Sequence, residues 1–197
     1  HGRRWIWTAV HNFGGRFALF GDLRGLARDV GELMASAPDR LEGIGVAPEA
    51  IENNTVFYEA AADLVWGPLD VDTWLEDFAV QRYGVRREGA AGESAREAWR
   101  LLGATLYGPG RTRSIPSPVI ARPWSASAPF ATQRLAGEAL PAEPARMSAN
   151  IDAENDPAVL GDLPAIARAA QLLISLDERA VSQDSRERDV VELVGHV

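Results

Sequence analysis

The stretch WIWTAVHNFGG, residues 5–15, combines the two features that decide the fold class. Residues 5–10 are rich in aromatic and β-branched side chains, a composition typical of strands. Residues 14–15 are a glycine pair, which can take turn conformations that are closed to other residues. The stretch therefore predicts a buried strand that runs into a loop.

The segments that follow alternate between helix and strand. Apolar residues spaced three and four apart predict an amphipathic helix over residues 22–37, closed by Pro38. The short apolar run of residues 43–47 predicts a second strand, and a second helix is expected over residues 51–66. This order is typical of a parallel sheet with crossover helices, and hence of an α/β fold. The inner face expected for the second helix consists of Val56, Phe57, Ala60, Leu64 and Val65.

No strand pattern follows residues 67–68, so the rest of the chain is expected to be helical. Four helices are predicted: one with Asp72 as its N-cap that ends at Gly84, one over residues 93–107, one opened by Asp162 with Pro164 near its first position, and one from about Arg186 to the end. Residues 108–150 are dense in Pro, Ser and Ala and predict a long loop. The chain is therefore expected to be mostly helical, with an α/β part over residues 1–68 and an all-helical part over residues 69–197.

Composition excludes several classes of function. The 197 residues carry a formal net charge of -8 and no lysine, which argues against a nucleic-acid partner, because affinity for phosphate backbones comes from clustered cations. The absence of cysteine excludes disulfides, thiolate nucleophiles and cysteine-bound metals. No apolar run reaches the roughly 18 to 20 residues that a membrane span requires.

Polar side chains follow both predicted strands. His11 and Asn12 follow the first, and Glu49 follows the second. Ligands of parallel α/β sheets gather at the carboxyl ends of the strands, so these three residues are candidates for a functional site. A glutamate there can act as a nucleophile, as a general acid or base, or as a metal ligand.

Each candidate also has a structural interpretation, which is the commoner one for such residues. Glu49 after proline is a frequent helix start, favoured by the helix dipole. His11 is more often a hydrogen-bonded structural histidine than a catalyst, and Asn54 suits a polar first turn. Packing is the expected role of five tryptophans: Trp5, Trp7, Trp66, Trp74 and Trp99.

Four segments closely resemble, in order and spacing, the C-terminal half of the α-N-acetylglucosaminidases, a glycoside hydrolase family whose animal member degrades heparan sulfate. These segments are WIWTAVHNFGGRFALFGDL, GIGVAPEAIENNTVFYEAAADLVW, FAVQRYG and SPVIARP. The resemblance covers about Arg4 to Trp124 and is weaker beyond. It implies that residues 1–68 are the last strands of a (β/α)8 catalytic barrel. Residues 69–197 then correspond to a truncated all-helical C-terminal domain.

The resemblance also implies a mechanism. Family members cleave terminal α-linked N-acetylglucosamine with retention of configuration, and their nucleophile is the glutamate of an APE motif, which corresponds to Glu49. Retention requires a second carboxylate roughly 5 to 5.5 Å away, which in the family lies upstream of the matching segment. The resemblance assigns His11 and Asn12 to the substrate-binding rim. Trp7 and Asn54 complete the set of candidate substrate-binding residues, and strand alternation leaves open whether Trp7 points into the barrel or towards the helices.

The chain is thus expected to be a fragment of a glycosidase that acts on glycans with terminal α-N-acetylglucosamine, and to be inactive alone. No metal or organic cofactor is implied, because two carboxylates suffice for the reaction. One alternative is a noncatalytic helical module for protein interaction or sugar binding. Another is an unrelated hydrolase built on His11 and an acidic partner, for which no serine or cysteine nucleophile motif is present. Arginine in place of every lysine indicates a high-GC bacterial genome. Secreted and cytoplasmic locations are both open, although animal members of the family are lysosomal. The oligomeric state is also left open.

Overall fold

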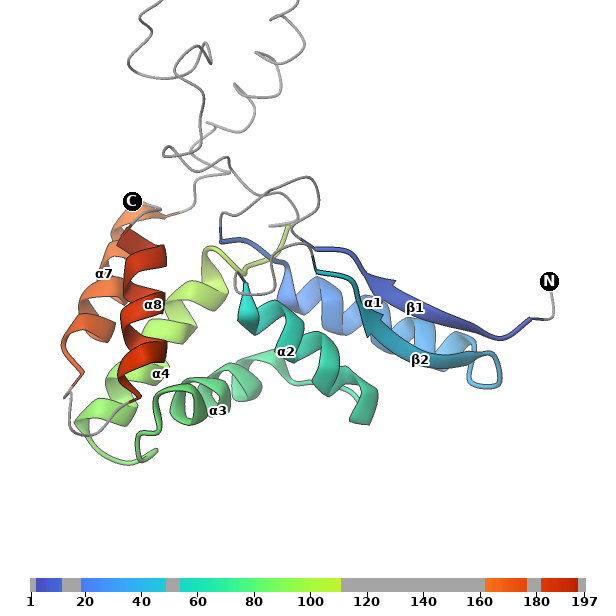
Figure 1. The fold of residues 1–197 in the computed structure, drawn as a ribbon, viewed down its shortest axis with the longest axis horizontal. Coiled ribbons are helices and arrows are strands. Elements are labelled where there is room, and N and C mark those ends of the chain that lie inside the picture. Colours follow the sequence, from blue (N-terminus) through green and yellow to red (C-terminus); the bar gives the residue numbers. More distant parts are fainter. Residues whose placement is uncertain (1–2, 12–18, 49–53, 111–161, 177–181, 195–197) are drawn as a thin grey trace, which may run out of the picture.

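The computed structural model shows a two-stranded sheet at one end of an elongated molecule and a group of helices at the other (Figure 1). It describes residues 3–11, 19–48, 54–110, 162–176 and 182–194. Most of the loop predicted over residues 108–150 lies outside these ranges.

The two strands are those predicted from the sequence. Strand β1 spans Trp5–Ala9 and strand β2 spans Leu41–Val46. They pair in parallel, with Thr8 opposite Gly45, as the predicted order of elements requires. Helix α1, Leu23–Ser36, connects them and matches the predicted helix over residues 22–37.

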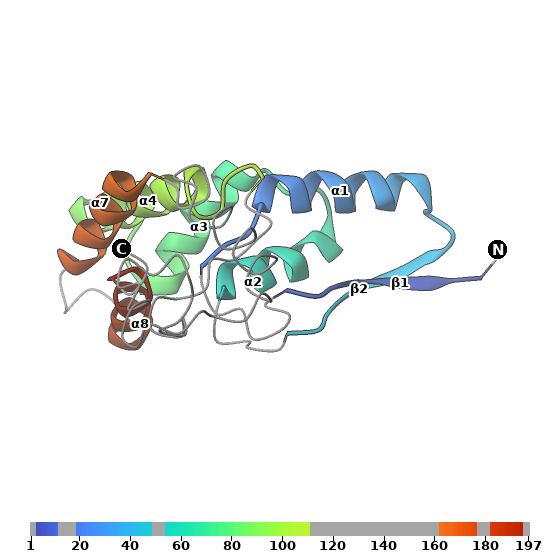
Figure 2. The ribbon, with the colours of Figure 1, turned by 90° about the horizontal axis from the view of Figure 1, so that it is seen from above.

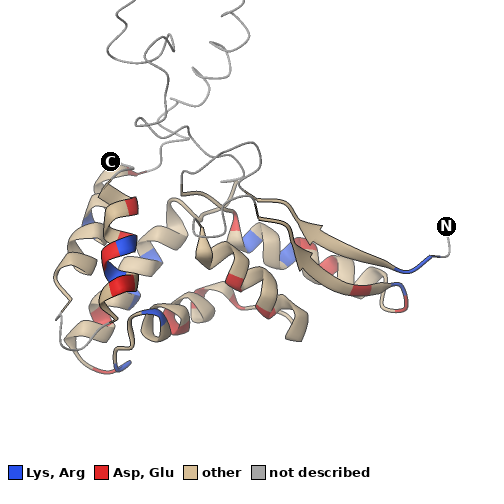
Figure 3. Cartoon of the chain, viewed as in Figure 1, with Lys and Arg blue, Asp and Glu red and all other residues tan. Residues whose placement is uncertain are grey.

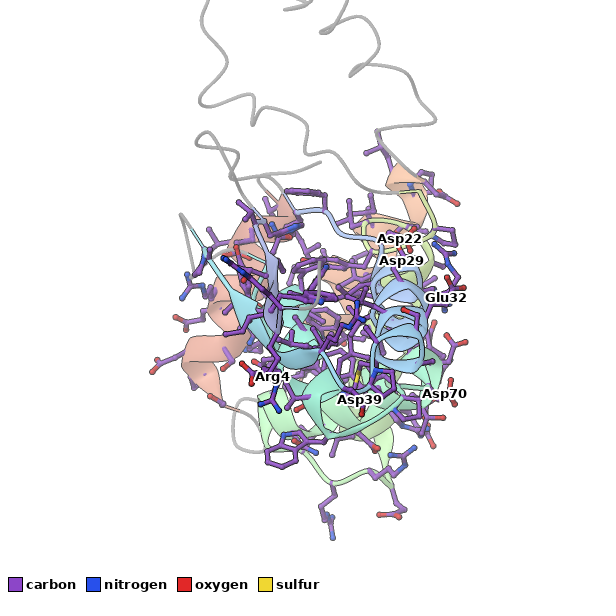
Figure 4. The ribbon with its side chains drawn as sticks, turned by 90° about the vertical axis from the view of Figure 1, so that its right-hand side faces the viewer. Arg4, Asp22, Asp29, Glu32, Asp39 and Asp70 are labelled. Atoms are coloured by element: carbon purple, nitrogen blue, oxygen red, sulfur yellow. The ribbon has the colours of Figure 1, made fainter. Side chains whose placement is uncertain are left out.

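Helices cover one face of this sheet, as the view from above shows (Figure 2). Trp7 and Ile44 project to that side and pack against the hydrophobic core. Ile6 and Val10 project to the other side, where their exposed fractions are 61% and 57%. The outer side of α1 is polar, and Asp29 and Glu32 point away from the strands (Figure 4).

The second predicted helix is shorter than expected. Helix α2 spans Thr55–Asp63, and the chain then tightens into a 3-10 turn over Leu64–Trp66. Because a 3-10 turn has three residues per turn rather than 3.6, the residues after Leu64 leave the inner face of the helix. The predicted burial of Val65 and Trp66 is therefore wrong, and Trp66 is 89% exposed.

Four further helices form the other end of the molecule. They are α3, Val71–Tyr83; α4, Ala90–Ala104; α7, Leu163–Ile174; and α8, Gln183–Val194. The predictions that Gly84 ends α3 and that Asp162 caps α7 are confirmed: Gly84 has φ 65°, and the Asp162 side chain accepts from the Ala165 N–H at 3.1 Å.

Three of these helices have predicted boundaries that are wrong by two or three residues. The N-cap of α3 is Asp70 rather than Asp72, because the buried Val71 already belongs to the helix. Helix α4 was predicted over residues 93–107, and each of its ends lies three residues earlier. Helix α8 begins at Gln183 rather than Arg186. Among the described helices, none combines the length and the apolar character that crossing a lipid bilayer requires.

One hydrophobic core joins the two ends of the molecule. Fully buried members from successive helices include Leu23, Val30, Val56, Ala61, Leu75, Leu102, Ile166, Leu173 and Leu193. Trp99 lies within this core, edge-on to Phe78 with ring centroids 4.6 Å apart. The predicted packing role holds for Trp7, Trp74 and Trp99, all of which contact the core.

Helix α8 is strongly charged, with acidic and basic side chains interspersed along it (Figure 3). One acidic residue, Asp189, points inward and is only 6% exposed. It accepts hydrogen bonds from Arg82 Nε and Nη2, both at 2.6 Å, and from the Tyr83 hydroxyl at 2.7 Å. A buried ion pair therefore ties α8 to α3.

Candidate functional site

The carboxyl ends of β1 and β2 lie side by side. The Ala47 N–H donates to the Ala9 carbonyl at 2.9 Å, so the parallel pairing continues one residue beyond β2. The described chain stops after His11 at the first strand and after Pro48 at the second. Two candidates, Asn12 and Glu49, lie outside the described residues.

His11 is buried within aromatic rings. Its imidazole is stacked between Phe20, at 4.0 Å, and Phe57, at 3.9 Å, measured between ring centroids. The edge of Tyr58 completes the enclosure at 5.8 Å. The remaining exposed fraction of His11 is 8%. Both faces of the ring are therefore occupied by side chains of this chain.

The protonation state of His11 follows from this burial. Desolvation lowers the pKa of His11 to about 4, and the hydrogen bond to the Phe20 carbonyl opposes this only in part. The ring is therefore neutral near pH 7. Because Nε2 lies 3.0 Å from the Phe20 carbonyl oxygen, which can only accept, this nitrogen carries the proton and donates. Because the ring is enclosed on both faces and its low pKa makes it a weak base, the structure does not favour the hydrolase built on His11.

Asn54 is the second candidate that the structure describes, and its side chain is buried, with 1% exposure. Its backbone is left-handed, with φ 54° and ψ 37°, a conformation that asparagine tolerates better than most residues. Its Oδ1 accepts from the Phe20 N–H at 2.9 Å and from the Tyr107 hydroxyl at 3.1 Å. Its carbonyl accepts from the Phe57 N–H at 2.9 Å, which opens α2.

His11 and Asn54 thus meet at the same residue, Phe20. The imidazole holds the carbonyl of Phe20, while the Asn54 amide oxygen holds its N–H. Tyr107 joins them and was missed by sequence reasoning. It lies outside the apolar stripe of the predicted helix over residues 93–107, and its partner is 53 positions away.

Trp7 does not share this position. It lies on the helix-facing side of β1 and contacts the hydrophobic core, which answers the question of its orientation in this structure. A cavity of about 20 Å³, large enough for a water molecule, lies beside Tyr107. It is lined by Leu19, Thr55, Tyr107, Arg82 and Glu192, among others. In the part of the chain that the structure describes, no group of three or more His, Asp and Glu side chains is arranged to hold a metal ion.

Two solved structures share this fold. One is a Clostridium perfringens protein described as CpGH89, with two glutamates changed to glutamine, in complex with its substrate GlcNAc-alpha-1,4-galactose. It has a TM-score of 0.68 and 22% identity, and the match covers 96% of this chain and 19% of that one. Another, a family 89 glycoside hydrolase from the same organism with bound 2-acetamido-1,2-dideoxynojirmycin, has a TM-score of 0.67 and 24% identity, with the same coverage. The fold is therefore the one found in this region of family 89 glycoside hydrolases.

The sequence comparisons identify the family. Residues 1–68 match the tim-barrel domain of alpha-N-acetylglucosaminidase (NAGLU), and residues 74–197 match its C-terminal domain. Human alpha-N-acetylglucosaminidase is 37% identical over 109 residues, which is 54% of this chain and 14% of the human protein. The chain belongs to the alpha-N-acetylglucosaminidase family, as the resemblance of its motifs implied. It spans 14% of the length of the human relative.

Proposed function

We propose that the protein containing this chain is a retaining exo-glycosidase that removes terminal α-linked N-acetylglucosamine from glycans, with Glu49 as its nucleophile. The observation that carries the proposal is the place of the APE motif in a chain of this family. Glu49 follows the last residue of β2 by three positions in the sequence, and β2 itself ends beside the end of a parallel neighbour strand. Ligands of barrels and open parallel sheets bind at this edge.

The chemistry requires two carboxylates. Glu49 attacks the anomeric carbon while an acid protonates the departing oxygen, which breaks the glycosidic bond and leaves a glycosyl-enzyme ester. The same acid, now a base, then takes a proton from water, which attacks the ester and releases the sugar and the Glu49 carboxylate. The Clostridium perfringens neighbour with its substrate carries two glutamate-to-glutamine changes, in keeping with a pair of carboxylates.

The second carboxylate is assigned to a part of the protein outside residues 1–197. In this proposal residues 1–68 are the last strands of a (β/α)8 barrel and residues 69–197 belong to the helical C-terminal domain. The chain alone then holds one of the two catalytic groups and is inactive. The exposed apolar side of the sheet, with Ile6 and Val10, supports this assignment, because the inner face of a barrel is normally covered by its other strands.

The test is hydrolysis of an aryl α-N-acetylglucosaminide by the complete protein, by the 197-residue chain, and by two variants of the complete protein. Glu49→Gln is expected to lower kcat by at least about 10³-fold, as the loss of a nucleophile does. Glu42→Gln is the matched control, because Glu42 lies on β2 but is exposed and its ion pair, with Arg4 at 2.9 Å, is exposed too. It should retain normal turnover. Near-normal turnover by Glu49→Gln would overturn the proposal.

Azide supplies a second readout. In Glu49→Ala the small anion can occupy the space of the missing carboxylate and attack the anomeric carbon in its place. Recovery of turnover, with a β-glycosyl azide as product, is expected if Glu49 is the nucleophile. If neither azide nor formate restores turnover in Glu49→Ala, the result would point to a binding role for Glu49.

A further inference from the structure

The chain segments that leave the sheet edge are tied to each other where the described structure resumes. After β1 the described chain resumes at Leu19, and after β2 it resumes at Asn54. The Asn54 Oδ1 accepts the Phe20 N–H at 2.9 Å. One buried side chain therefore joins the two returning segments.

Tyr107 reaches this junction from the helical part of the molecule. It follows α4 and lies among the residues matched by the C-terminal domain. Its hydroxyl donates to the same Asn54 Oδ1 at 3.1 Å. Its carbonyl accepts from Leu23 N–H at 3.3 Å, and the carbonyl of Leu106 accepts from Gly21 N–H at 3.2 Å. The segment after α4 thus holds both the backbone of Gly21 and Leu23 and the side chain of Asn54.

This contact uses the full capacity of the acceptor. An amide oxygen has two lone pairs, and Phe20 and Tyr107 take one each. Tyr107 is 2% exposed, and burial raises its pKa well above the ordinary value, so its hydroxyl stays protonated near pH 7 and can donate. The left-handed backbone of Asn54, φ 54°, is a sparsely populated conformation that persists when surrounding contacts impose it.

We propose that Tyr107 is a positioning residue for the hydrolysis: its hydroxyl fixes Asn54, and Asn54 in turn fixes the end of the segment that contains Glu49. The helical domain thereby contributes to the alignment of a nucleophile that belongs to the barrel. This rests on the proposed function above. In this role the Tyr107 hydroxyl acts through Asn54 and does not contact the substrate.

The experiment compares two substitutions that each remove one buried hydroxyl from the complete protein. Tyr107→Phe removes the contact to Asn54. Tyr83→Phe is the matched control, because the Tyr83 hydroxyl is equally buried and has two partners, Asp189 at 2.7 Å and Trp99 at 2.9 Å, but does not touch Asn54. Tyr107→Phe is expected to lower kcat by about 10-fold to 100-fold with KM within about twofold, as small misplacements of a reacting group do. Tyr83→Phe should lower the melting temperature at least as much and leave kcat unchanged.

A double-substitution cycle separates positioning from general destabilisation. Asn54→Gly keeps the left-handed backbone but removes the acceptor. If Tyr107 acts through Asn54, Tyr107→Phe has no further effect on kcat in the Asn54→Gly background. Full additivity in kcat, or wild-type kcat in Tyr107→Phe alongside a lower melting temperature, would overturn the proposal.

Amide hydrogen exchange distinguishes a failure of this proposal from a failure of the proposed function. An inert wild-type protein would refute the glycosidase assignment, whatever the variants do. Exchange at the Phe20 amide should still accelerate about fivefold or more in Tyr107→Phe, the effect of one lost neutral hydrogen bond, and remain unchanged in Tyr83→Phe. Equal exchange rates in all three proteins would show that Tyr107 does not hold this junction.

Discussion

Replacing Asp189 by asparagine tests how α8 is attached to the rest of the molecule. Asp189 accepts three hydrogen bonds, two from Arg82 and one from Tyr83, and the side-chain exposures of the ion pair are 12% for Arg82 and 8% for Asp189. Burial alone would lower the pKa of Arg82, but the hydrogen bonds and charge of Asp189 outweigh it and raise that pKa. Arg82 therefore remains a cation, with Asp189 as its main counter-charge and Glu59 as a smaller one.

The magnitude follows from leaving that cation without its counter-charge. Removing one partner of a buried ion pair costs about 3 to 5 kcal/mol, whereas an exposed pair contributes less than about 1 kcal/mol. Asparagine keeps the shape of the side chain and one acceptor oxygen, so Asp189→Asn is expected to lose about 3 kcal/mol. Glu42→Gln removes the same kind of charge from an exposed pair, with side-chain exposures of 71% and 50%, and should lose less than about 1 kcal/mol.

The assay is urea unfolding of the complete protein, with hydrogen exchange of the α8 peptide as a local readout, because proteins of several domains often unfold in more than one step. Asp189→Asn should lower the midpoint of the transition that includes α8 and accelerate exchange there. Equal, small losses in Asp189→Asn and Glu42→Gln would refute the reasoning. They would mean that water or another group compensates Arg82 when the carboxylate is removed.

Two further predictions concern pH and glycine. Burial lowers the pKa of His11 from 6.5 to about 4. As the pH falls below about 6.5, the unfolded chain takes up a proton at His11 while the folded chain does not, so the free energy of unfolding decreases. The loss reaches up to about 3 kcal/mol near pH 4, at about 1.4 kcal/mol per pH unit. Thermal melts of the wild type and of His11→Gln across this window check it, and parallel curves would contradict it. Gly92→Ala should destabilise by about 1 to 3 kcal/mol, because a Cβ there would meet the carbonyl oxygens of Arg86 and Arg87. Gly31→Ala should stabilise α1 by about 0.5 to 1 kcal/mol, because a Cβ added there has nothing within 4 Å. Melting temperatures of the Gly92 and Gly31 variants that shift in the same direction would refute these two expectations.

The parts of the fold that could be predicted are those whose signal is local. The aromatic and β-branched run of β1 and the three-and-four spacing of α1 lie within single elements, and both elements appear where predicted. The errors arise where one element meets another. Trp66 is exposed because the chain changes from an α-helix to a 3-10 turn at Leu64, and Asp70 rather than Asp72 caps α3 because packing draws Val71 into the helix. Such effects are set by contacts with other elements, so periodicity does not report them.

For the candidate site, the sequence offered candidate residues but no information about their contacts. His11 was expected at the substrate-binding rim and Asn54 among the substrate-binding residues, and their contact with substrate stays a prediction. The structure adds that both are buried and hold the backbone of Phe20 from opposite sides. Tyr107 carried no signal, because its role depends on a contact between parts of the chain that only the folded state brings together.

The burial of these residues has a physical reason that fits the proposed chemistry. A carboxylate nucleophile must be held in place before the substrate arrives, because reordering it during the reaction would add to the barrier. The sheet holds one end of the APE segment, through the Ala47 N–H and the Ala9 carbonyl at 2.9 Å. The other end is held by Asn54, which the Tyr107 hydroxyl and the Phe20 N–H fix from two directions. Neutral groups suit this task better than charged ones, because a neutral imidazole and an amide fix the geometry of the backbone without adding a charge at the ends of the strands.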